Sequence, residues 1–435
     1  MGSVRLMTLD PGHFHAALVQ KEMYANVDKQ VHVYAPLGAD LTSHVERIVG
    51  FNNRAEKPTS WELEVHASPD FAQRAWQERP GNVVILSGRN RPKIGYIRQA
   101  VAAGLNVLAD KPWIIRSDDL PVLEESLNEA EKKGLVIYDI MTERFEITNI
   151  LQRELIHDAA VFGESIAGTF EEPAVYMESK HFLLKTVAGV PLRRPVWFFD
   201  IGLQGEGLTD VGTHLVDLVP WLLFPDQAID YRREVEVLQG RRWPTLISRA
   251  DFHRISGADH FPDFLANSVR DDLLEYFCNN SVAYTVRSVH VKMDILWDFE
   301  AAPGSGDTHF AVVRGSRSRI EIRQGPEQGF RPELYVVPNR QDDQQKVFEA
   351  LEKKIVALSA TYPGLAIAAS NNAFQVLIPD RYRIGHEAHF AEVTRKFLTY
   401  LEKPASLPAW EKANMLAKYF VTTKGVDLAH QPNAR

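Results

Sequence analysis

The spacing of apolar positions divides the chain into two parts, with the change near residue 160. Before it, short continuous apolar runs alternate with segments of helical spacing, which is typical of parallel strands buried on both faces by helices. The pattern therefore predicts a doubly wound parallel sheet. The expected strands are 5–9, 30–34, 62–66, 82–87, 106–109 and 135–138, and the expected helices include 96–103, 120–133 and 144–156.

After residue 160 the runs are longer and often alternate apolar with polar positions, which predicts a mostly antiparallel sheet with one face turned to solvent or ligand. The expected strands are 165–170, 174–180, 234–239, 281–294 and 310–322. Amphipathic helices of a C-terminal extension are expected at 341–358, 386–401 and 408–423. We predict an α/β protein with two domains, 1–155 and 156–435, packed around a cleft because no flexible linker separates them.

Composition excludes some classes of function. The apolar fraction of 45% is that of a globular protein, and a net charge of −8 argues against a general nucleic-acid or anionic-membrane partner. The single Cys278 excludes an internal disulfide, and no apolar run is long enough to span a membrane. The first residues lead directly into a strand, which leaves no room for an export signal. We expect a cytoplasmic protein, unless a leader was removed from this chain.

The segment 104–113 carries the first candidate for chemistry. Its apolar run stops at Asp110, Lys111 and Pro112. Ligands of open α/β sheets bind beyond the carboxyl ends of such strands, so the Lys111 ammonium is expected to point into a cofactor crevice. The alternative is a surface lysine in an ordinary turn between strand and helix.

The turn after the first strand occupies the place of a dinucleotide-binding fingerprint, G-x-G-x-x-G. Only the second glycine is present, as Gly12, while Asp10 and His15 stand at the first and third positions. The acid expected about 20 residues later for the ribose is missing, and the next one is Asp40. Either the backbone of 37–39 and Ser43 hold the adenosine end, or the site does not exchange a free cofactor. An ordinary turn is the alternative.

In the second part, residues 204–217 begin with glycines and continue with helical spacing. Asp210 and His214 are four residues apart, so on a helix they share one face. A histidine oriented by a carboxylate suits general acid–base catalysis near neutral pH. A pair that only packs at a domain interface is the alternative.

These three segments, in this order, resemble the glucose-fructose oxidoreductase, inositol dehydrogenase and rhizopine-catabolism family (Gfo/Idh/MocA). Asp110-Lys111-Pro112 is similar to the family's Glu-Lys-Pro, and Asp210 to His214, with Gly212 and Asp217, matches its Asp-x-x-x-His segment. Asn90 keeps the family's asparagine above the cofactor, whereas Lys93 replaces a frequent histidine. The stretches 179–182, 194–200 and 407–411 look like those of a bacterial branch of oxidoreductases with a distinct C-terminal domain.

The resemblance implies a Rossmann domain followed by an α+β domain whose open sheet faces the nicotinamide of NAD or NADP. The residues implied to bind the cofactor are Asp10, Gly12, His13, Phe14, His15, Ser87, Asn90, Asp110 and Lys111. The implied catalytic residues are Lys111, Asp210 and His214. A homo-oligomer built through the open sheet is also implied, unless the C-terminal extension covers that face.

Polar side chains among aromatic ones suggest a carbohydrate-like small-molecule substrate. The candidates to bind it are Lys180, His181, Trp197, Asp200, Glu206, Asp210 and Tyr382, with Lys185 nearby. No metal is expected, because His386-Glu387-Ala388-His389 lacks the H-E-x-x-H spacing and an evident third ligand.

Three functions remain open at this point. The first is NAD(P)-dependent hydride transfer at a carbinol of a sugar, polyol or sugar derivative. The second is glycoside cleavage with a tightly bound, recycled NAD, in which transient oxidation acidifies a neighbouring C–H and permits elimination. The third is a catalytically silent binding protein, against which the presence of Lys111, Asp210 and His214 argues.

Overall fold

The computed structural model describes residues 4–187 and 190–431. Contacts divide the chain into two compact units, each described here by itself. The parallel-sheet unit contains the chain up to Thr142 together with Gly202–Gly205 and Gly385–Lys412. The mixed-sheet unit contains Glu143–Ile201, Glu206–Ile384 and the chain from Ala413.

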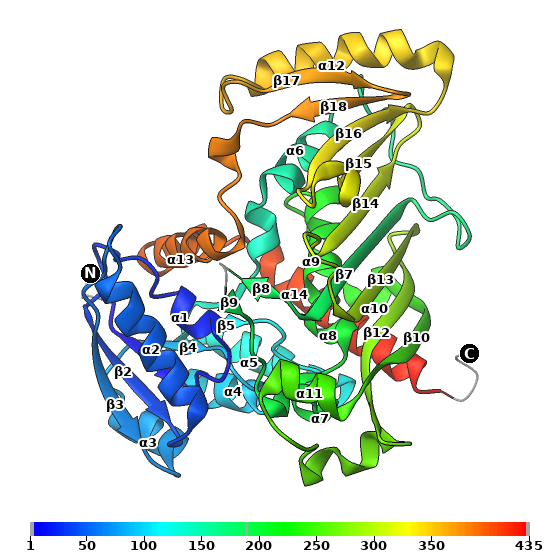
Figure 1. Ribbon diagram of the computed structural model, residues 1–435. Helices are drawn as coiled ribbons and strands as arrows, with labels where there is room; N and C mark the ends of the chain where they lie inside the picture. The colour runs from blue at the N-terminus through cyan, green and yellow to red at the C-terminus, as the bar shows by residue number, and fades with distance from the viewer. Residues whose placement is uncertain (1–3, 188–189, 432–435) are drawn as a thin grey trace. The chain divides into compact units, whose positions relative to one another are not determined.

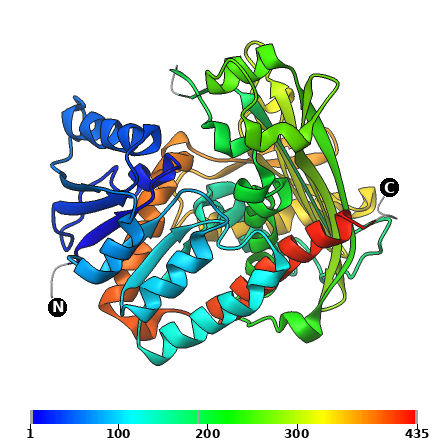
Figure 2. The same ribbon diagram turned by 90° about the horizontal axis from the view of Figure 1, so that it is seen from below.

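The parallel-sheet unit is a six-stranded sheet in the order β3-β2-β1-β4-β5-β6 with every pairing parallel (Figure 1). This is the order of a Rossmann fold, and helices lie on both faces of the sheet (Figure 2). The strands are β1 (Leu6–Leu9), β2 (Gln30–Ala35), β3 (Glu62–Ala67), β4 (Val83–Leu86), β5 (Asn106–Asp110) and β6 (Ile137–Ile140). The helices are α1 (His15–Leu18), α2 (Ala39–Asn53), α3 (Phe71–Glu78), α4 (Lys93–Ala102) and α5 (Leu120–Lys132).

A later segment of the chain completes this unit. Helix α13 (His386–Glu402) packs near α1 and β6, where the rings of Tyr138 and Tyr400 are 5.3 Å apart. Phe390 of α13 is buried and lies 4.6 Å from the His15 ring, measured between centroids. The predicted division at residue 155 follows the chain, whereas the contacts group α13 with the first 142 residues.

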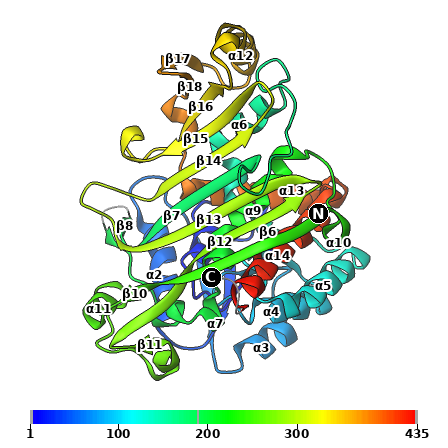
Figure 3. The same ribbon diagram turned by 90° about the vertical axis from the view of Figure 1, so that its right-hand side faces the viewer.

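The mixed-sheet unit is built on a ten-stranded sheet, seen face-on in Figure 3. Its order is β10-β12-β13-β7-β14-β15-β16-β18-β17, with β11 paired to β12, and only β13 and β7 run parallel. The strands are β7 (Val175–Leu184), β10 (Val235–Ile247), β11 (Val269–Arg270), β12 (Leu273–Val286), β13 (Val289–Glu300), β14 (Thr308–Arg314), β15 (Ser318–Gln324), β16 (Glu333–Pro338), β17 (Ala366–Ser370) and β18 (Ala373–Leu377). A separate two-stranded sheet pairs β8 (Thr186–Val187) with β9 (Val190–Pro191). The predicted α/β class with a mostly antiparallel second sheet is confirmed.

Helices cover one face of this sheet, and α6, α8 and α9 pack on its central strands. Residues along β13 alternate between buried and partly exposed, as expected for a sheet with one covered face. The helices of this unit are α6 (Ile147–Ile156), α8 (Gly207–Asp210), α9 (Gly212–Leu223), α10 (Tyr231–Glu234), α11 (Arg249–Ser256) and α12 (Gln344–Leu358). Two more helices, α7 (Ile201–Gln204) and α14 (Trp410–Ala429), contain residues of both units. No helix among the described residues is long and apolar enough to cross a membrane.

Two of the predicted long strands are in fact hairpins. The segment 281–294 contains the turn between β12 and β13, where Arg287 and Ser288 both have positive φ, 48° and 66°. A turn with two positive φ values normally uses Gly, Asn or Asp, so this sequence gave no turn signal. The segment 310–322 likewise contains the turn between β14 and β15. The strand predicted at 165–170 is wrong, because those residues form only isolated bridges at Ser165 and Gly168.

Candidate active site

The carboxyl ends of β1, β4 and β5 meet in the parallel-sheet unit, where this fold places its ligands. Asp10 follows β1 with a φ of 46°, a left-handed conformation that aspartate tolerates better than most residues, so it can stand where the fingerprint has glycine. A Cβ on Gly88, just after β4, would lie 2.2 Å from the Asp10 carbonyl oxygen. The two loops therefore touch through their backbones, and a side chain at position 88 would displace the turn after β1.

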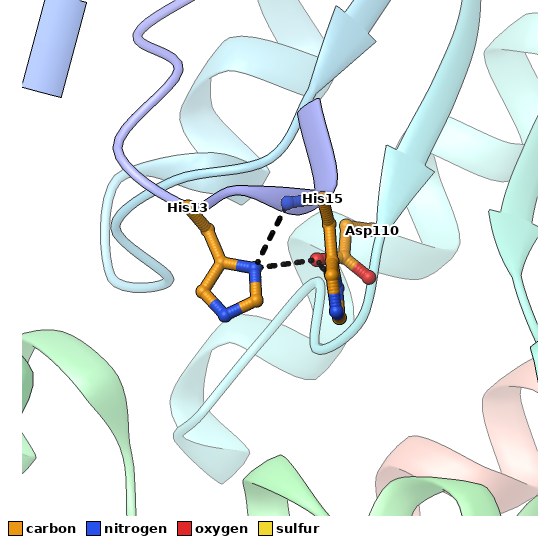
Figure 4. Close-up of side chains that lie close together, drawn as sticks. All are labelled: His13, His15 and Asp110. Carbon is orange, nitrogen blue, oxygen red and sulfur yellow. Dashed lines mark hydrogen bonds and ion pairs between the residues drawn. The ribbon is translucent and has the colours of Figure 1, made fainter. Parts of the chain in front are cut away.

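Asp110 ends β5 and holds a cluster of polar side chains (Figure 4). Its Oδ2 lies 2.9 Å from His15 Nδ1 and 3.7 Å from His13 Nδ1, and it accepts a hydrogen bond from Ser87 Oγ at 3.0 Å. Burial alone would raise the pKa of the Asp110 carboxyl, but His15, Lys93 and His13 outweigh it and hold that pKa well below its usual range. Burial lowers the pKa of the His15 imidazole, and Asp110 opposes this shift.

Lys111 is buried at the end of β5, with 9% of its surface exposed, and the Lys111–Pro112 peptide bond is cis. The buried side chain of Lys93 holds the turn that contains Lys111. Its Nζ donates to Asn90 Oδ1 (2.7 Å) and to the carbonyl oxygens of Asp110 (2.8 Å) and Pro112 (2.9 Å). Lys93 itself is 2% exposed. The position where the related family often has histidine is therefore a buried support of the Lys111 turn.

Asn90 also has a structural role within this unit. Its Nδ2 donates to the carbonyl oxygen of Gln204 at 2.7 Å, and its backbone N–H donates to the carbonyl oxygen of Leu203 at 3.1 Å. Arg91 N–H donates to the same Leu203 oxygen at 3.0 Å. The asparagine thus anchors Gly202–Gly205 to the loop after β4.

Arg89 is a site residue that the sequence analysis missed. Its guanidinium donates to Asp10 Oδ1 at 3.2 Å and to Asp40 Oδ2 at 2.9 Å, linking the loops after β1, β2 and β4. Burial raises the pKa of Asp10, and Arg89 opposes that shift. The acid considered for the missing ribose position is thus engaged with an arginine. Arg89 follows Asp40 by 49 residues, so no local sequence pattern predicts that the two side chains pair.

The residues at the carboxyl ends of β1, β4 and β5 could hold a dinucleotide, but not through a glycine-rich turn. Helix α1 has only four residues, so its N-terminus offers no extended helix dipole. The backbone N–H of Gly12 donates to the Asp10 carbonyl oxygen at 2.7 Å and that of His13 to the Ser87 carbonyl oxygen at 3.2 Å. A pyrophosphate would therefore be held mainly by side chains: His13, His15, Arg89 and Lys111.

Asp210 and His214 belong to the mixed-sheet unit. Val211, between α8 and α9, keeps helical dihedral angles of −68° and −40°, so the two residues lie one helical turn apart as predicted. Gly207, at the start of α8, packs so closely that a Cβ would lie 2.0 Å from the Cys278 carbonyl oxygen. The two glycines at 207 and 212 let this helical segment approach β12 and β13 directly.

Asp217, one turn further along α9, is fully engaged. It accepts hydrogen bonds from Arg144 Nε and Nη2 at 2.6 and 2.8 Å and from Lys418 Nζ at 3.1 Å. Burial would raise the pKa of its carboxyl, but Arg144 and Lys418 lower it to about 2. This buried triad ties α9 to the 3-10 helix before α6, where Arg144 lies, and to α14.

Glu206 directly precedes α8, and its buried carboxylate contacts three side chains. Its carboxylate accepts from Asn280 Nδ2 at 2.9 Å and lies 2.9 Å from Arg242 Nε and 2.8 Å from His430 Nε2. These contacts fix the start of the segment that carries Asp210. The structure thus gives this substrate-binding candidate a clear role in positioning α8.

Lys180 and His181 lie on opposite faces of β7, because neighbouring residues of a strand alternate. Lys180 Nζ is 3.2 Å from Asp298. His181 Nδ1 is 3.1 Å from Asp307 Oδ2, which also accepts from Lys185 Nζ at 2.5 Å. His181 and Lys185, outweighing the effect of burial, hold the pKa of Asp307 far below its usual range. Asp307 was missed because only the fold brings it to β7.

Arg194 donates hydrogen bonds to the carbonyl oxygens of Leu183 at 3.0 Å and Phe182 at 3.3 Å, at the end of β7. Its guanidinium is buried, lies 5.0 Å from the Trp297 ring, and interacts electrostatically with Asp210 and Asp307. The Trp297 ring is in turn 5.1 Å from His181. In the mixed-sheet unit, the Trp297 ring therefore lies close to both the buried Arg194 guanidinium and the His181 ring. Trp197 is buried in the 3-10 helix Val196–Phe199, and Asp200 caps the end of that helix.

Tyr382 lies elsewhere in the mixed-sheet unit. It follows β18, packs 5.6 Å from the Tyr362 ring, and donates its hydroxyl to the Pro363 carbonyl oxygen at 3.2 Å. In the sheet order, β18 is six positions from β12, on which α8 packs, or roughly 29 Å at the usual strand spacing. The contacts thus do not bring Tyr382 to Asp210.

Residues 151–430 match a sequence family described as "Putative oxidoreductase C terminal domain". A search of curated proteins found no match. A structure described as a putative oxidoreductase from Parabacteroides merdae is 48% identical, covers 98% of both chains and superposes with a TM-score of 0.96.

More distant structures share the fold. A 3-ketoreductase from Actinomadura kijaniata, solved with NADP and TDP-benzene, is 14% identical with a TM-score of 0.57, covering 97% of this chain and 96% of the other. A structure described as a putative myo-inositol dehydrogenase from Sinorhizobium meliloti is 14% identical with a TM-score of 0.55, covering 98% and 97%.

Proposed function

The chain belongs to the oxidoreductase family defined by this C-terminal domain, and on that premise we propose that it transfers a hydride between NAD(P) and a carbinol carbon of a sugar, polyol or sugar derivative. The fold agrees with that of the NADP-bound 3-ketoreductase. The observation that carries the proposal is Lys111. Its buried position at the carboxyl end of β5, fixed by Lys93, is where this fold presents groups to a nicotinamide ring.

His214 is the proposed proton acceptor for the substrate hydroxyl. It lies one helical turn from Asp210, on a segment that Glu206 and Asp217 fix at either side. Lys111 would donate a hydrogen bond to a substrate oxygen and stabilise developing negative charge on it. The cofactor, when bound, accepts or supplies the hydride.

The substrate class follows from the cluster around Arg194. Its charged and hydrogen-bonding groups, together with the Trp297 ring, suit a molecule with several hydroxyls and one apolar face. His181 and Arg194 are therefore the residues of the mixed-sheet unit that we propose to contact a carbohydrate-like substrate.

One observation favours a second function, redox-neutral glycoside cleavage with a retained NAD. Asp40 is paired with Arg89, and the acid that usually binds the ribose of an exchanging cofactor is missing. A cofactor held by the side chains of His13, His15 and Arg89 suits one that is recycled in place. Release of an aglycone without net reduction of added NAD would identify this reaction.

The test compares Lys111→Ala and His214→Ala with the wild type in a screen of polyols, sugars and aryl glycosides. We expect each variant to lose at least about 100-fold in kcat, since general acid–base groups contribute 10²- to 10⁴-fold. Circular dichroism would verify that both variants remain folded. Turnover near that of the wild type in both would contradict the proposed site, and no turnover of any substrate by the wild type would favour a binding protein.

A further inference from the structure

His13, His15 and Asp110 form a cluster of three potential metal ligands, two of which, His13 and His15, are also residues that could hold the cofactor pyrophosphate (Figure 4). One potential ligand atom from each residue lies within 4.8 Å of the other two. His13 and His15 come from the turn after β1 and Asp110 from the end of β5, so the cluster joins two strands on either side of β4. It lies at the edge of the sheet where this fold binds ligands.

The separations between these atoms suit a small cation. Zinc ligands lie at about 2.0–2.1 Å from the ion, which puts tetrahedral neighbours roughly 3.4 Å apart. The observed distances from Asp110 Oδ2 are 2.9 Å to His15 Nδ1 and 3.7 Å to His13 Nδ1, on either side of that value. An ion among them would replace the hydrogen between His15 and Asp110, and the His15 proton would move to Nε2. It would also displace the hydrogen bond that His13 Nδ1 accepts from the His15 backbone N–H at 3.4 Å.

The surroundings match those of metal sites in two further respects. The carboxylate is supported from behind, because Ser87 Oγ donates to the same Asp110 oxygen at 3.0 Å, as outer-shell groups do for metal-bound carboxylates. A third imidazole is close, since the His386 ring of α13 lies 5.5 Å from that of His15. The His386-Glu387-Ala388-His389 segment, from which no metal site was expected, thus brings the His386 ring close to His15.

We propose that His13, His15 and Asp110 bind a divalent transition-metal ion of the zinc type. Two imidazoles and one carboxylate select such ions over Mg²⁺ and Ca²⁺, which prefer oxygen ligands. Three protein ligands leave coordination positions for water or an anionic oxygen. The site goes beyond the proposed function: hydride transfer does not require the ion, although His13 and His15 are also assigned to the pyrophosphate.

A second group, His32, Glu64 and His66, has a similar ligand set and serves as the internal comparison. His32 Nδ1 lies 3.1 Å from His66 Nε2, and Glu64 is 3.6 Å from each. This group lies on β2 and the edge strand β3, and the Glu64 side chain is 49% exposed. Burial favours the first cluster, where His15 and Asp110 are 7% and 4% exposed.

The experiment titrates the EDTA-treated full-length protein with Zn²⁺ by isothermal calorimetry, without a dinucleotide. We expect one tight site per chain in the wild type and a loss of at least about 10-fold in affinity in His15→Gln and Asp110→Asn. His13→Gln, at a partly exposed position that a fold tolerates more easily, should show the same loss. His66→Gln is the matched control and should retain the site.

Two results would overturn the proposal: no Zn²⁺ binding tighter than millimolar by the folded wild type, or a tight site that His66→Gln abolishes and His13→Gln leaves intact. Because the measurement contains no nicotinamide cofactor and no substrate, either result would leave the proposed hydride transfer untouched.

Discussion

Lys93 shows how one buried charge can organise a catalytic turn. It is 2% exposed, and its ammonium is satisfied by three oxygens from the loop after β4 and the turn after β5. An ammonium has three hydrogens to donate, so these partners use its full capacity. The residue therefore positions Lys111 without needing to touch the substrate.

Replacing Lys93 with Met should keep the volume and remove all three donors. We expect the free energy of unfolding to fall by about 3 kcal/mol, since buried acceptors without partners are costly. Urea denaturation measures this, with Lys132→Met, at an exposed helix position, as the control. A loss in Lys93→Met no larger than that of the control would contradict the role assigned to this ammonium.

Some residues of the candidate site could be predicted from the sequence and others could not. The turn of Asp110 and Lys111, the pair at 210 and 214 and the unusual turn at 10–15 could be found because each is local. Arg89, Asp307 and the support given by Lys93 could not, because their partners are far away in the chain, such as Asp110 at 17 positions and His181 at 126. Only the fold supplies those distances.

At the scale of elements, the buried carboxylate of Asp217 fixes α9 within the mixed-sheet unit. Asp217 binds both Arg144 and Lys418, and all three groups are almost fully buried. Removing one member of such a triad is strongly destabilising, because it leaves a buried charge without its partner.

The boundaries of the elements at the turns were less predictable from the sequence. Arg287 and Ser288 make a tight turn without the residues that usually form one.

Asp217 predicts a dependence of stability on pH. The pKa of its carboxyl is about 2 in the folded protein and near 3.9 when unfolded, so its contribution is complete above about pH 4. That contribution, about 2 kcal/mol, is lost as the pH falls toward 2. Asp217→Asn should lose about 3–5 kcal/mol at pH 7 and show a flatter acid limb in urea titrations. An unchanged acid limb would rule out this assignment.

Gly88→Ala tests the contact between the loops after β1 and β4. Because its Cβ would lie 2.2 Å from the Asp10 carbonyl oxygen, the turn that carries His13 and His15 must move. We expect NADH affinity to fall at least about 10-fold while the thermal midpoint changes by only a few degrees. Gly95→Ala, where nothing lies within 4 Å, is the matched control. Equal NADH affinity in the two variants would refute the proposed role of this loop.

At the scale of the whole molecule, the parallel-sheet unit is assembled from three stretches of chain. The hydrophobic pattern predicted its sheet and most of its helices, including 386–401, yet assigned that helix to a C-terminal extension. Periodicity reports which face of a helix is buried but not which surface covers it.

A fragment of residues 1–155 should therefore fail to form a stable sheet. It lacks α13, whose Phe390, Phe397 and Tyr400 are each at most 2% exposed, and burial of each contributes about 1.5–3 kcal/mol. The sum is comparable with the stability of a whole domain. Near-ultraviolet circular dichroism should show no fixed tertiary structure, whereas a fusion to residues 385–412 should restore it. A cooperatively folded 1–155 fragment would contradict this account.

The central claim, that this oxidoreductase works through NAD(P), is tested most directly by native mass spectrometry of the purified full-length protein, before and after addition of NADH or NADPH. The account predicts one dinucleotide per chain, either co-purified or bound at micromolar concentration, with binding weakened in Gly88→Ala. A protein that carries no dinucleotide and binds neither one up to millimolar concentration would contradict it.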